Sequence, residues 1–193
     1  MDKDTSEGLL VGCIPLGAAF GGVLMKVIEK FLSRKHSFYF VNALAIVGGV
    51  LVLLQKEWLL VSGRLIQGAC VGMYSGLVPI MVKEIAPIEI LRTLGAIKNL
   101  LIVFGYFFGF LLSYILSFFL EVSQYWYISF SFTLLTISIQ QILFFVHYTN
   151  ETPKYLILKG RIEEAKQLID KWYLPEYQQK KYEQILKDLE AHN

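Results

Sequence analysis

Five long apolar runs dominate the pattern of hydrophobic and polar positions along the chain. They cover residues 8–28, 38–54, 58–82, 94–120 and 125–146, and short polar stretches separate them. Each run has about the length of a tilted helix that crosses roughly 30 Å of hydrocarbon. The runs are continuously apolar, without the period-two alternation of a membrane β-barrel strand. Because a helix satisfies its backbone hydrogen bonds within one segment, the pattern predicts five transmembrane helices, which form a bundle over residues 8–148.

The pattern changes after residue 146. Residues 161–173 and the segment that follows Pro175 carry apolar positions at helical spacing, with polar residues between them. We predict two short amphipathic helices in a helical linker that covers residues 149–193. Their many acidic side chains would be repelled by anionic lipid, which favours helices that cap the bundle over helices that lie on the bilayer surface.

The composition agrees with a membrane protein. Of the 193 residues 55% are hydrophobic and only 18% are charged, and the mean hydropathy is +0.51. These values indicate an integral membrane protein, and a net charge of +2 gives no reason to expect a nucleic-acid partner. The sequence has no His/Cys/acid cluster with metal-ligand spacing and no H-E-x-x-H motif. We therefore expect no metal, no cofactor and no enzymatic activity, and we expect Cys13 and Cys70 to be packing residues.

The basic residues indicate how the helices are oriented in the membrane. Fifteen of the 18 lysines and arginines lie at or near the turns 26–35 and 83–98 or in the tail after residue 150. By the positive-inside rule this side is cytoplasmic. We thus expect a multi-pass protein of the plasma membrane, with its N-terminus outside and its C-terminus, including the two amphipathic helices, in the cytoplasm. An odd number of spans, such as five, fits this orientation.

The third apolar run combines an arginine with a row of glycines. Arg64 lies near the start of the run, where a charge costs about 3 kcal/mol on insertion scales. Gly68, Gly72 and Gly76 follow at four-residue spacing and form a stripe without side chains, so another helix can approach closely. We interpret all four as structural residues of a helical bundle with an interior, in which Arg64 contacts polar groups. Such a bundle is typical of transporters and channels.

Three polar clusters, at residues 29–35, 83–92 and 150–156, lie on the side expected to be cytoplasmic. Each joins acids to bases at the foot of a helix, so ion pairs between helices there could hold one end of the bundle shut and break when it opens. The alternative is a set of solvated loop charges, worth under about 1 kcal/mol per pair. The residues expected in this cytoplasmic gate are Glu29, Arg34, Lys35, Glu84, Arg92, Glu151 and Lys154.

Three segments of the chain resemble motifs of the sugar porter family within the major facilitator superfamily. Residues 63–87 are similar to that family's fourth span and following loop, G-R-x-x-x-G-x-x-x-G and then V-P-x-Y-x-x-E-x-A-P. Residues 150–156, N-E-T-P-K-Y-L, are similar to the P-E-S-P-R-Y-L motif after the sixth span, and residues 17–35 resemble a degraded copy of the second span and its basic loop. The resemblance covers about residues 8–173. It implies an all-α integral membrane fold, namely a partial N-terminal helical bundle that corresponds to spans two to six.

The resemblance also implies a function. A complete family member moves a sugar, here a hexose-like one, by alternating access, and its partners are the lipid bilayer and the sugar itself. The family has a glutamine that binds sugar hydroxyls where this chain has Asn99, so Asn99 is the candidate substrate contact, although it could instead bond to a neighbouring helix. Arg92 lies one position beyond the family's arginine, about 100° around a helix.

Two hypotheses follow for the chain as a whole. Since alternating access needs two repeats around a shared site, we expect this incomplete half not to transport alone but to act with the missing transporter half. Alternatively, the chain is a non-transporting membrane subunit or regulator that binds a full-length transporter.

Overall fold

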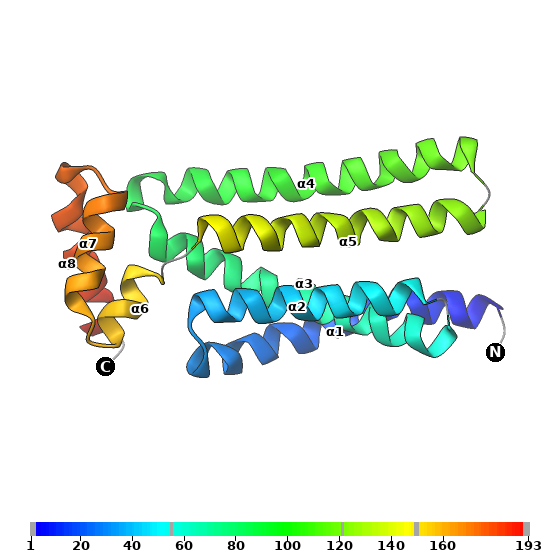
Figure 1. Cartoon of the computed structure of the whole chain (residues 1–193), viewed down its shortest axis with the longest axis horizontal. Helices are drawn as coiled ribbons and strands as arrows, with labels where there is room; N and C mark the ends of the chain where they lie inside the picture. The colour runs from blue at the N-terminus through cyan, green and yellow to red at the C-terminus, as the bar shows by residue number, and fades with distance from the viewer. Residues whose placement is uncertain (1–2, 55, 121, 149–150, 191–193) are drawn as a thin grey trace.

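The computed structural model describes residues 3–54, 56–120, 122–148 and 151–190, which form eight α-helices and no strand (Figure 1). The helices are α1 (Lys3–Phe31), α2 (Arg34–Leu53), α3 (Glu57–Ile85), α4 (Ile88–Phe119), α5 (Val122–His147), α6 (Pro153–Leu158), α7 (Ile162–Trp172) and α8 (Pro175–Glu190).

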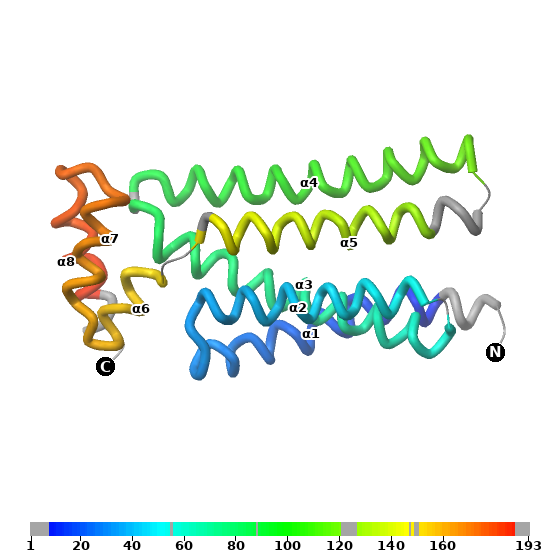
Figure 2. Tube along the Cα trace, in the orientation of Figure 1, coloured from blue at the N-terminus to red at the C-terminus, as the bar shows by residue number. Residues whose placement is uncertain are grey.

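Helices α1 to α5 run side by side along the long axis of the molecule, as the trace in Figure 2 also shows. Each contains a segment long and apolar enough to cross a membrane, so the predicted all-α membrane fold is confirmed. These segments are Gly8–Phe31, Arg34–Leu53, Glu57–Ile85, Glu89–Phe119 and Tyr127–Val146.

The second helix begins four residues before the apolar run that predicted it. Ser33 has an extended backbone, and its hydroxyl accepts a hydrogen bond from the backbone N–H of His36 at 3.3 Å. This N-cap supplies an acceptor for one of the unpaired donors of the first turn. The helix therefore starts at Arg34 and carries that side chain in its first turn.

Helix α3 lies at the centre of a three-helix group, because it packs along both α1 and α2, which make few contacts with each other. The contact between α1 and α3 is built on glycines. A Cβ atom added to Gly68 or Gly72 of α3 would collide with the α1 backbone, whereas one on Gly76 would meet only the Met25 side chain, at 3.7 Å. Two glycines of the predicted stripe thus lie where the helix backbones touch, and the third lies at the edge of that contact.

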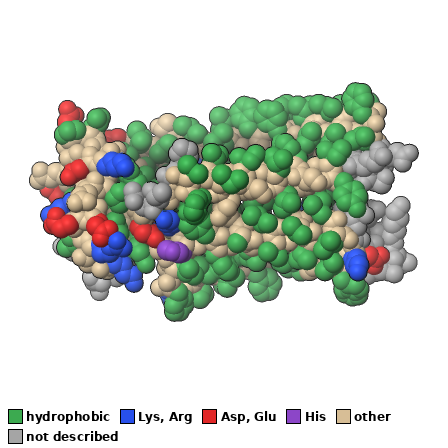
Figure 3. Space-filling model, viewed as in Figure 1, with side chains coloured by type: hydrophobic (Ala, Val, Ile, Leu, Met, Phe, Trp, Pro, Cys, Tyr) green, Lys and Arg blue, Asp and Glu red, His purple; other side chains and the backbone are tan. Residues whose placement is uncertain are grey.

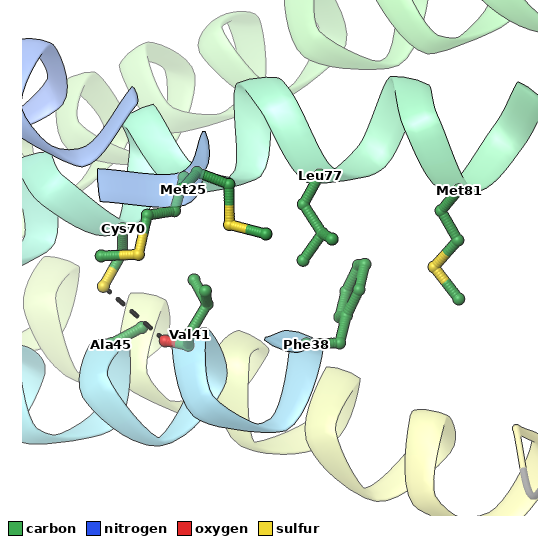
Figure 4. Packing of buried hydrophobic residues seen from close by; sticks show 8 residues of the cluster. Met25, Phe38, Val41, Ala45, Cys70, Leu77 and Met81 are labelled. Carbon is green, nitrogen blue, oxygen red and sulfur yellow. Dashed lines mark hydrogen bonds between the residues drawn. The ribbon is translucent and has the colours of Figure 1, made fainter. Parts of the chain in front are cut away.

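The apolar core of this group joins α1, α2 and α3 (Figure 4). Figure 4 shows Leu77 and Met81 of α3 facing Phe38 of α2, and Cys70 pointing toward Val41. The Cys70 thiol donates to the Val41 carbonyl at 3.7 Å. Burial of these side chains fixes the relative positions of the three helices. The buried members of the core are Met25, Phe38, Val41, Ala45, Cys70, Met73, Leu77 and Met81.

Helices α4 and α5 form a more loosely packed pair beside the three-helix group (Figure 1). No residue of the most apolar window of either helix is buried. A soluble protein rarely leaves so large an apolar surface in water. The exposed faces of α4 and α5 are therefore suited to lipid or to further membrane helices.

The last three helices lie across one end of the bundle, at the left in Figure 1. Helix α7 and helix α8 are the two expected amphipathic helices, and the short α6 precedes them. Gly160, with a φ of 75°, makes the turn between α6 and α7 in the left-handed region that glycine adopts without strain. Ile169, Tyr173 and Ile185 form a small buried core between α7 and α8.

We call this end of the bundle the charged end. It comprises the α1–α2 turn (residues 29–36), the C-terminal turn of α3 with its connection to α4 (residues 83–87), and helices α6 to α8 with the preceding residues 151–152. Figure 3 shows most acidic and basic side chains of the visible face gathered there, while hydrophobic side chains cover the long helices.

Candidate gate at the charged end of the bundle

The carboxylate of Glu84 lies at the centre of the candidate gate. Arg34, in the first turn of α2, donates from Nε to Glu84 Oε1 at 3.1 Å, and Thr152 donates from Oγ1 to Glu84 Oε2 at 2.7 Å. Only 7% of the Glu84 side chain is exposed. A buried carboxylate needs such partners on both oxygens. Glu84 thus joins α3 to α2 on one side and to the start of α6 on the other.

A second acid of the predicted gate contacts the α1–α2 turn. Glu151 Oε1 accepts a hydrogen bond from Ser33 Oγ at 2.7 Å and lies 3.3 Å from His36 Nδ1. The other carboxylate oxygen, Oε2, is buried without a hydrogen-bond partner in the described part of the chain. This arrangement gives α6 a second attachment, to the turn that begins α2.

Arg34 has a second, weaker partner in the same turn. Glu29 Oε2 lies 3.7 Å from Arg34 Nη1, and about a fifth of each side chain is exposed. A partly exposed pair at this distance contributes well under the energy of the Glu84 contact. The structure thus brings four of the seven predicted gate residues, Glu29, Arg34, Glu84 and Glu151, into contacts that link the α1–α2 turn, α2, α3 and the start of α6.

The contacts just described do not include the other three predicted gate residues. The Lys35 ammonium lies 5.9 Å from the centre of the Tyr39 ring, and Lys154 is half-buried in the first turn of α6. Arg92 is exposed on α4. Among the residues that the structure describes, no hydrogen bond or ion pair of this network reaches Arg92.

Ser33, His36 and Thr152 belong to the network although the sequence analysis did not single them out. Ser33 is the N-cap of α2, and Thr152 is the N-cap of α6, where its hydroxyl accepts from the backbone N–H of Tyr155 at 3.4 Å. Ser and Thr directly before a helix, and Pro153 at the first helical position, are recognisable start signals. Those signals could have identified both residues as candidate N-caps, but not their contacts with Glu151 and Glu84.

The intramembrane arginine has an aromatic contact. The guanidinium of Arg64 lies 4.7 Å from the centre of the Phe130 ring of α5, and its Nε is buried without a hydrogen-bond partner among the described residues. A cation over a ring face is stabilised by the ring quadrupole. Polar partners were expected for Arg64 from the sequence, whereas the contact found among the described residues is with the Phe130 ring.

The candidate substrate contact, Asn99, is exposed on α4. It lies apart from the gate and lines neither of two cavities beside α4. One, of about 310 Å³, lies between α4 and α5 near Gly109 and Phe130. The other, of about 570 Å³, is apolar and lies between the ends of α3 and α4 and Trp172. The Asn99 amide therefore faces open space in this chain.

A buried polar network inside the bundle was not predicted. Asn42 of α2 is fully buried, donates from its amide to Gln141 Oε1 of α5, and accepts from the hydroxyl of Tyr74 of α3. Hydrogen bonds between membrane helices contribute about 0.6 kcal/mol on average and up to about 1.7. The network ties α5 to the three-helix group.

We expect Gln141→Leu to lower the thermal unfolding temperature of the detergent-purified chain, by an amount equivalent to about 1 kcal/mol, because it leaves Asn42 without its acceptor. Gln140→Leu is the matched control, since Gln140 is the exposed neighbour on the same helix. Tryptophan fluorescence during heating gives the measurement. Equal unfolding temperatures for the two variants would show that the network does not stabilise the bundle.

Comparison with known proteins gives a consistent set of relatives. Residues 2–193 match the family model described as "Sugar (and other) transporter". The chain is 33% identical over 163 residues to solute carrier family 2, facilitated glucose transporter member 4 of Bos taurus, covering 82% of this chain and 31% of that one. It is 29% identical over 166 residues to the probable metabolite transport protein CsbC of Bacillus subtilis, covering 86% and 35%. The chain thus spans about a third of the length of these curated relatives.

The fold has a close counterpart among solved structures. The partially occluded inward open conformation of the xylose transporter XylE from E. coli superposes with a TM-score of 0.86 at 20% identity, over 96% of this chain and 49% of that chain. A second XylE structure, of the proton:xylose symporter bound to 6-bromo-6-deoxy-D-glucose, gives the same TM-score over 99% and 45%. The five-span bundle with its capping helices is therefore part of a major facilitator fold.

Proposed function

The chain belongs to the sugar (and other) transporter family, and from that premise we propose that in its complete form the protein moves a hexose-like sugar across the membrane by alternating access. The named functions of the facilitated glucose transporter and of the xylose transporter support a sugar as the substrate class. The observation that carries the proposal is the buried Glu84 carboxylate, which Arg34 and Thr152 hold from two different elements.

The contacts around Glu84 suit a gate that closes and opens. In alternating access, one part of a helical bundle rocks against another around a fixed site, and each end must be held shut in turn. Charge-assisted hydrogen bonds hold their partners firmly, yet each breaks when its two elements move apart. When the charged end opens, α2 and α6 move away from α3, and the Arg34–Glu84 and Thr152–Glu84 contacts break.

We propose that the charged end faces the cytoplasm of a plasma-membrane protein, with the N-terminus outside. The excess of lysine and arginine at this end supports the orientation. Residues 8–148 then form the transmembrane unit, and residues 149–193 form a helical linker on the cytoplasmic side. Residues 149–150 and 191–193 of that linker lie outside the described residues.

Asn99 remains our proposed substrate contact. A carboxamide both donates to and accepts from sugar hydroxyls, and no charge is needed to recognise a neutral sugar. Its exposed position on α4 leaves the amide accessible to the second half of a complete transporter, which would enclose a sugar against it.

The test is sugar uptake by cells that lack their own hexose carriers. We expect the complete gene product to give saturable uptake of D-glucose that L-glucose does not match, and the 193-residue chain expressed alone to give none, because alternating access needs two repeats. Failure of the complete product with D-glucose, D-xylose and D-fructose would refute the proposed substrate class. Saturable uptake by the chain alone would refute the need for a second half.

The alternative is a non-transporting subunit or regulator that binds a full-length transporter. The unburied apolar window of α4 favours this candidate, since such a surface suits contact with other membrane helices. Co-purification of a tagged chain with a twelve-span transporter, in cells where the chain alone gives no uptake, would support it. A complete gene product with its own uptake would exclude it.

A further inference from the structure

The C-terminal turn of α3 has carbonyl groups that its own helix does not satisfy. The last carbonyls of any α-helix lack intrahelical partners. Here the shortage is greater, because the residue four positions after Lys83 is Pro87, which has no N–H to donate. The Ala86 N–H still bonds to the Val82 carbonyl, at 2.8 Å. The carbonyls of Lys83, Ile85 and Ala86 need donors from elsewhere.

Side chains from the C-terminal segment provide those donors. Lys181 of α8 donates from Nζ to the Ala86 carbonyl at 2.8 Å and to the Lys83 carbonyl at 3.4 Å. The hydroxyl of Tyr173, at the end of α7, donates to the carbonyl of Ile85. Two residues more than 85 positions along the chain therefore supply donors to three carbonyls of this one turn.

Burial and charge make this contact specific. Lys181 is only 4% exposed and Tyr173 only 8%, and the Lys181 ammonium lies 5.8 Å from the centre of the Tyr173 ring. A cation at the C-terminal end of a helix is stabilised by the helix dipole. Burial raises the pKa of Tyr173 to about 12, so its hydroxyl remains a donor at neutral pH. A lysine is seldom buried without such a set of acceptors.

We propose that Lys181, with Tyr173, caps α3 from the C-terminal segment and is a positioning residue for Glu84, which lies within the capped turn. The capping itself stands on the geometry above, and its effect on the gate rests on the proposed function. Without the cap, the last turn of α3 frays, and the Glu84 carboxylate loses its fixed position between Arg34 and Thr152.

The test is hydrogen–deuterium exchange of the 193-residue chain in detergent, followed by mass spectrometry. In Lys181→Met the apolar part of the side chain remains but the donors are lost. We expect exchange of amides 82–86 to rise about fivefold to twentyfold, with amides in the centre of α3 unchanged. Tyr173→Phe is expected to raise the exchange rate of the same amides by a smaller factor. Lys181→Arg keeps a cation with hydrogen-bond donors, so its exchange rates at these amides are expected to stay within about twofold of those of the original chain.

Lys180→Met is the matched control, because Lys180 is the exposed neighbour on α8 and extends over the Tyr177 ring instead. It is expected to leave amides 82–86 unchanged. Equal exchange in the Lys181→Met and Lys180→Met variants would overturn the proposal, as would a uniform rise along all five long helices. If Lys181→Met does not fold, the proposal is tested with Tyr173→Phe and Lys181→Arg instead. It then requires faster exchange of amides 82–86 in Tyr173→Phe than in Lys181→Arg, and equal exchange in the two variants would overturn it.

The effect on the gate is read separately, from the amides at the start of α2. Increased exchange of residues 35–38 together with 82–86 in Lys181→Met supports transmission from the cap to the Arg34–Glu84 contact. Faster exchange at amides 82–86 without a change at 35–38 would refute that transmission but would still support the capping of α3 by Lys181. Because neither readout uses sugar uptake, a failure of the proposed transport function would not be mistaken for a failure of the cap.

Discussion

Replacing Gly72 by isoleucine is expected to prevent stable association of α1 with α3. A Cβ atom at this position would collide with the backbone of Ala18 and come within 2.8 Å of the Gly22 nitrogen, and helix backbones cannot shift locally to make room. Overpacking of a well-packed contact costs about 1–3 kcal/mol, and more where backbone rather than a side chain must move. The purified variant is expected to elute as aggregate in size-exclusion chromatography, or to unfold at a temperature well below that of the original chain.

Gly76→Ala provides the control for this prediction. The added methyl group would lie 3.7 Å from the Met25 side chain, an ordinary van der Waals distance. Since alanine also favours the helix over the unfolded chain, by up to about 1 kcal/mol, this variant is expected to be as stable as the original or slightly more so. A Gly72→Ile chain that elutes and unfolds like Gly76→Ala would mean that α1 and α3 do not pack on these glycines.

Replacing Glu84 by alanine is expected to produce the largest change at the charged end. The variant leaves Thr152 without its acceptor and, among the described residues, leaves Arg34 with the 3.7 Å contact to Glu29 alone. Removing one partner of a buried, hydrogen-bonded charge pair costs about 3–5 kcal/mol. Because a fifth of Arg34 is exposed, we expect a lower value here, about 2 kcal/mol of unfolding free energy. The start of α6 is expected to become sensitive to protease while the centres of α1 to α3 stay protected.

The matched control is Glu164→Ala. The Arg161–Glu164 pair is shorter, at 2.6 Å, but about half of each side chain is exposed. The partner Arg161 lowers the pKa of Glu164 through its hydrogen bond, yet water screens this pair. We expect stability and protease sensitivity close to those of the original chain. If Glu164→Ala changed them as much as Glu84→Ala, burial of Glu84 would not be the source of the effect.

The fold and family were predictable because they depend on signals that are local in the sequence. Each apolar run has the length of a membrane helix, and the segments 63–87 and 150–156 carry motifs with fixed spacing. The residues at which helices begin were harder to predict. The N-caps Ser33 and Thr152 lie in polar turns, where several residues could begin a helix, and their partners, Glu151 and Glu84, are far away in the sequence.

Contacts between distant residues could not be obtained from one sequence. Asn42 and Gln141 are 99 positions apart, and nothing in either apolar run indicates that they meet. The same holds for Lys181 and the end of α3, since a lysine in an amphipathic helix is normally solvated. Such pairs follow from the packing of whole helices, which depends on the glycine contacts and the core around Leu77.

The most direct test of the account is the membrane sidedness of the charged end. Lys30→Cys in the α1–α2 turn, Lys166→Cys in α7 and Lys56→Cys at the opposite end of the bundle are each treated in intact cells with a membrane-impermeant maleimide. Cys13 and Cys70 are buried and contribute little background. We predict that Lys56→Cys reacts in intact cells, whereas Lys30→Cys and Lys166→Cys react only after permeabilisation. Reaction of Lys30→Cys and Lys166→Cys from opposite sides of the membrane would contradict the gate and the bundle on which it is built.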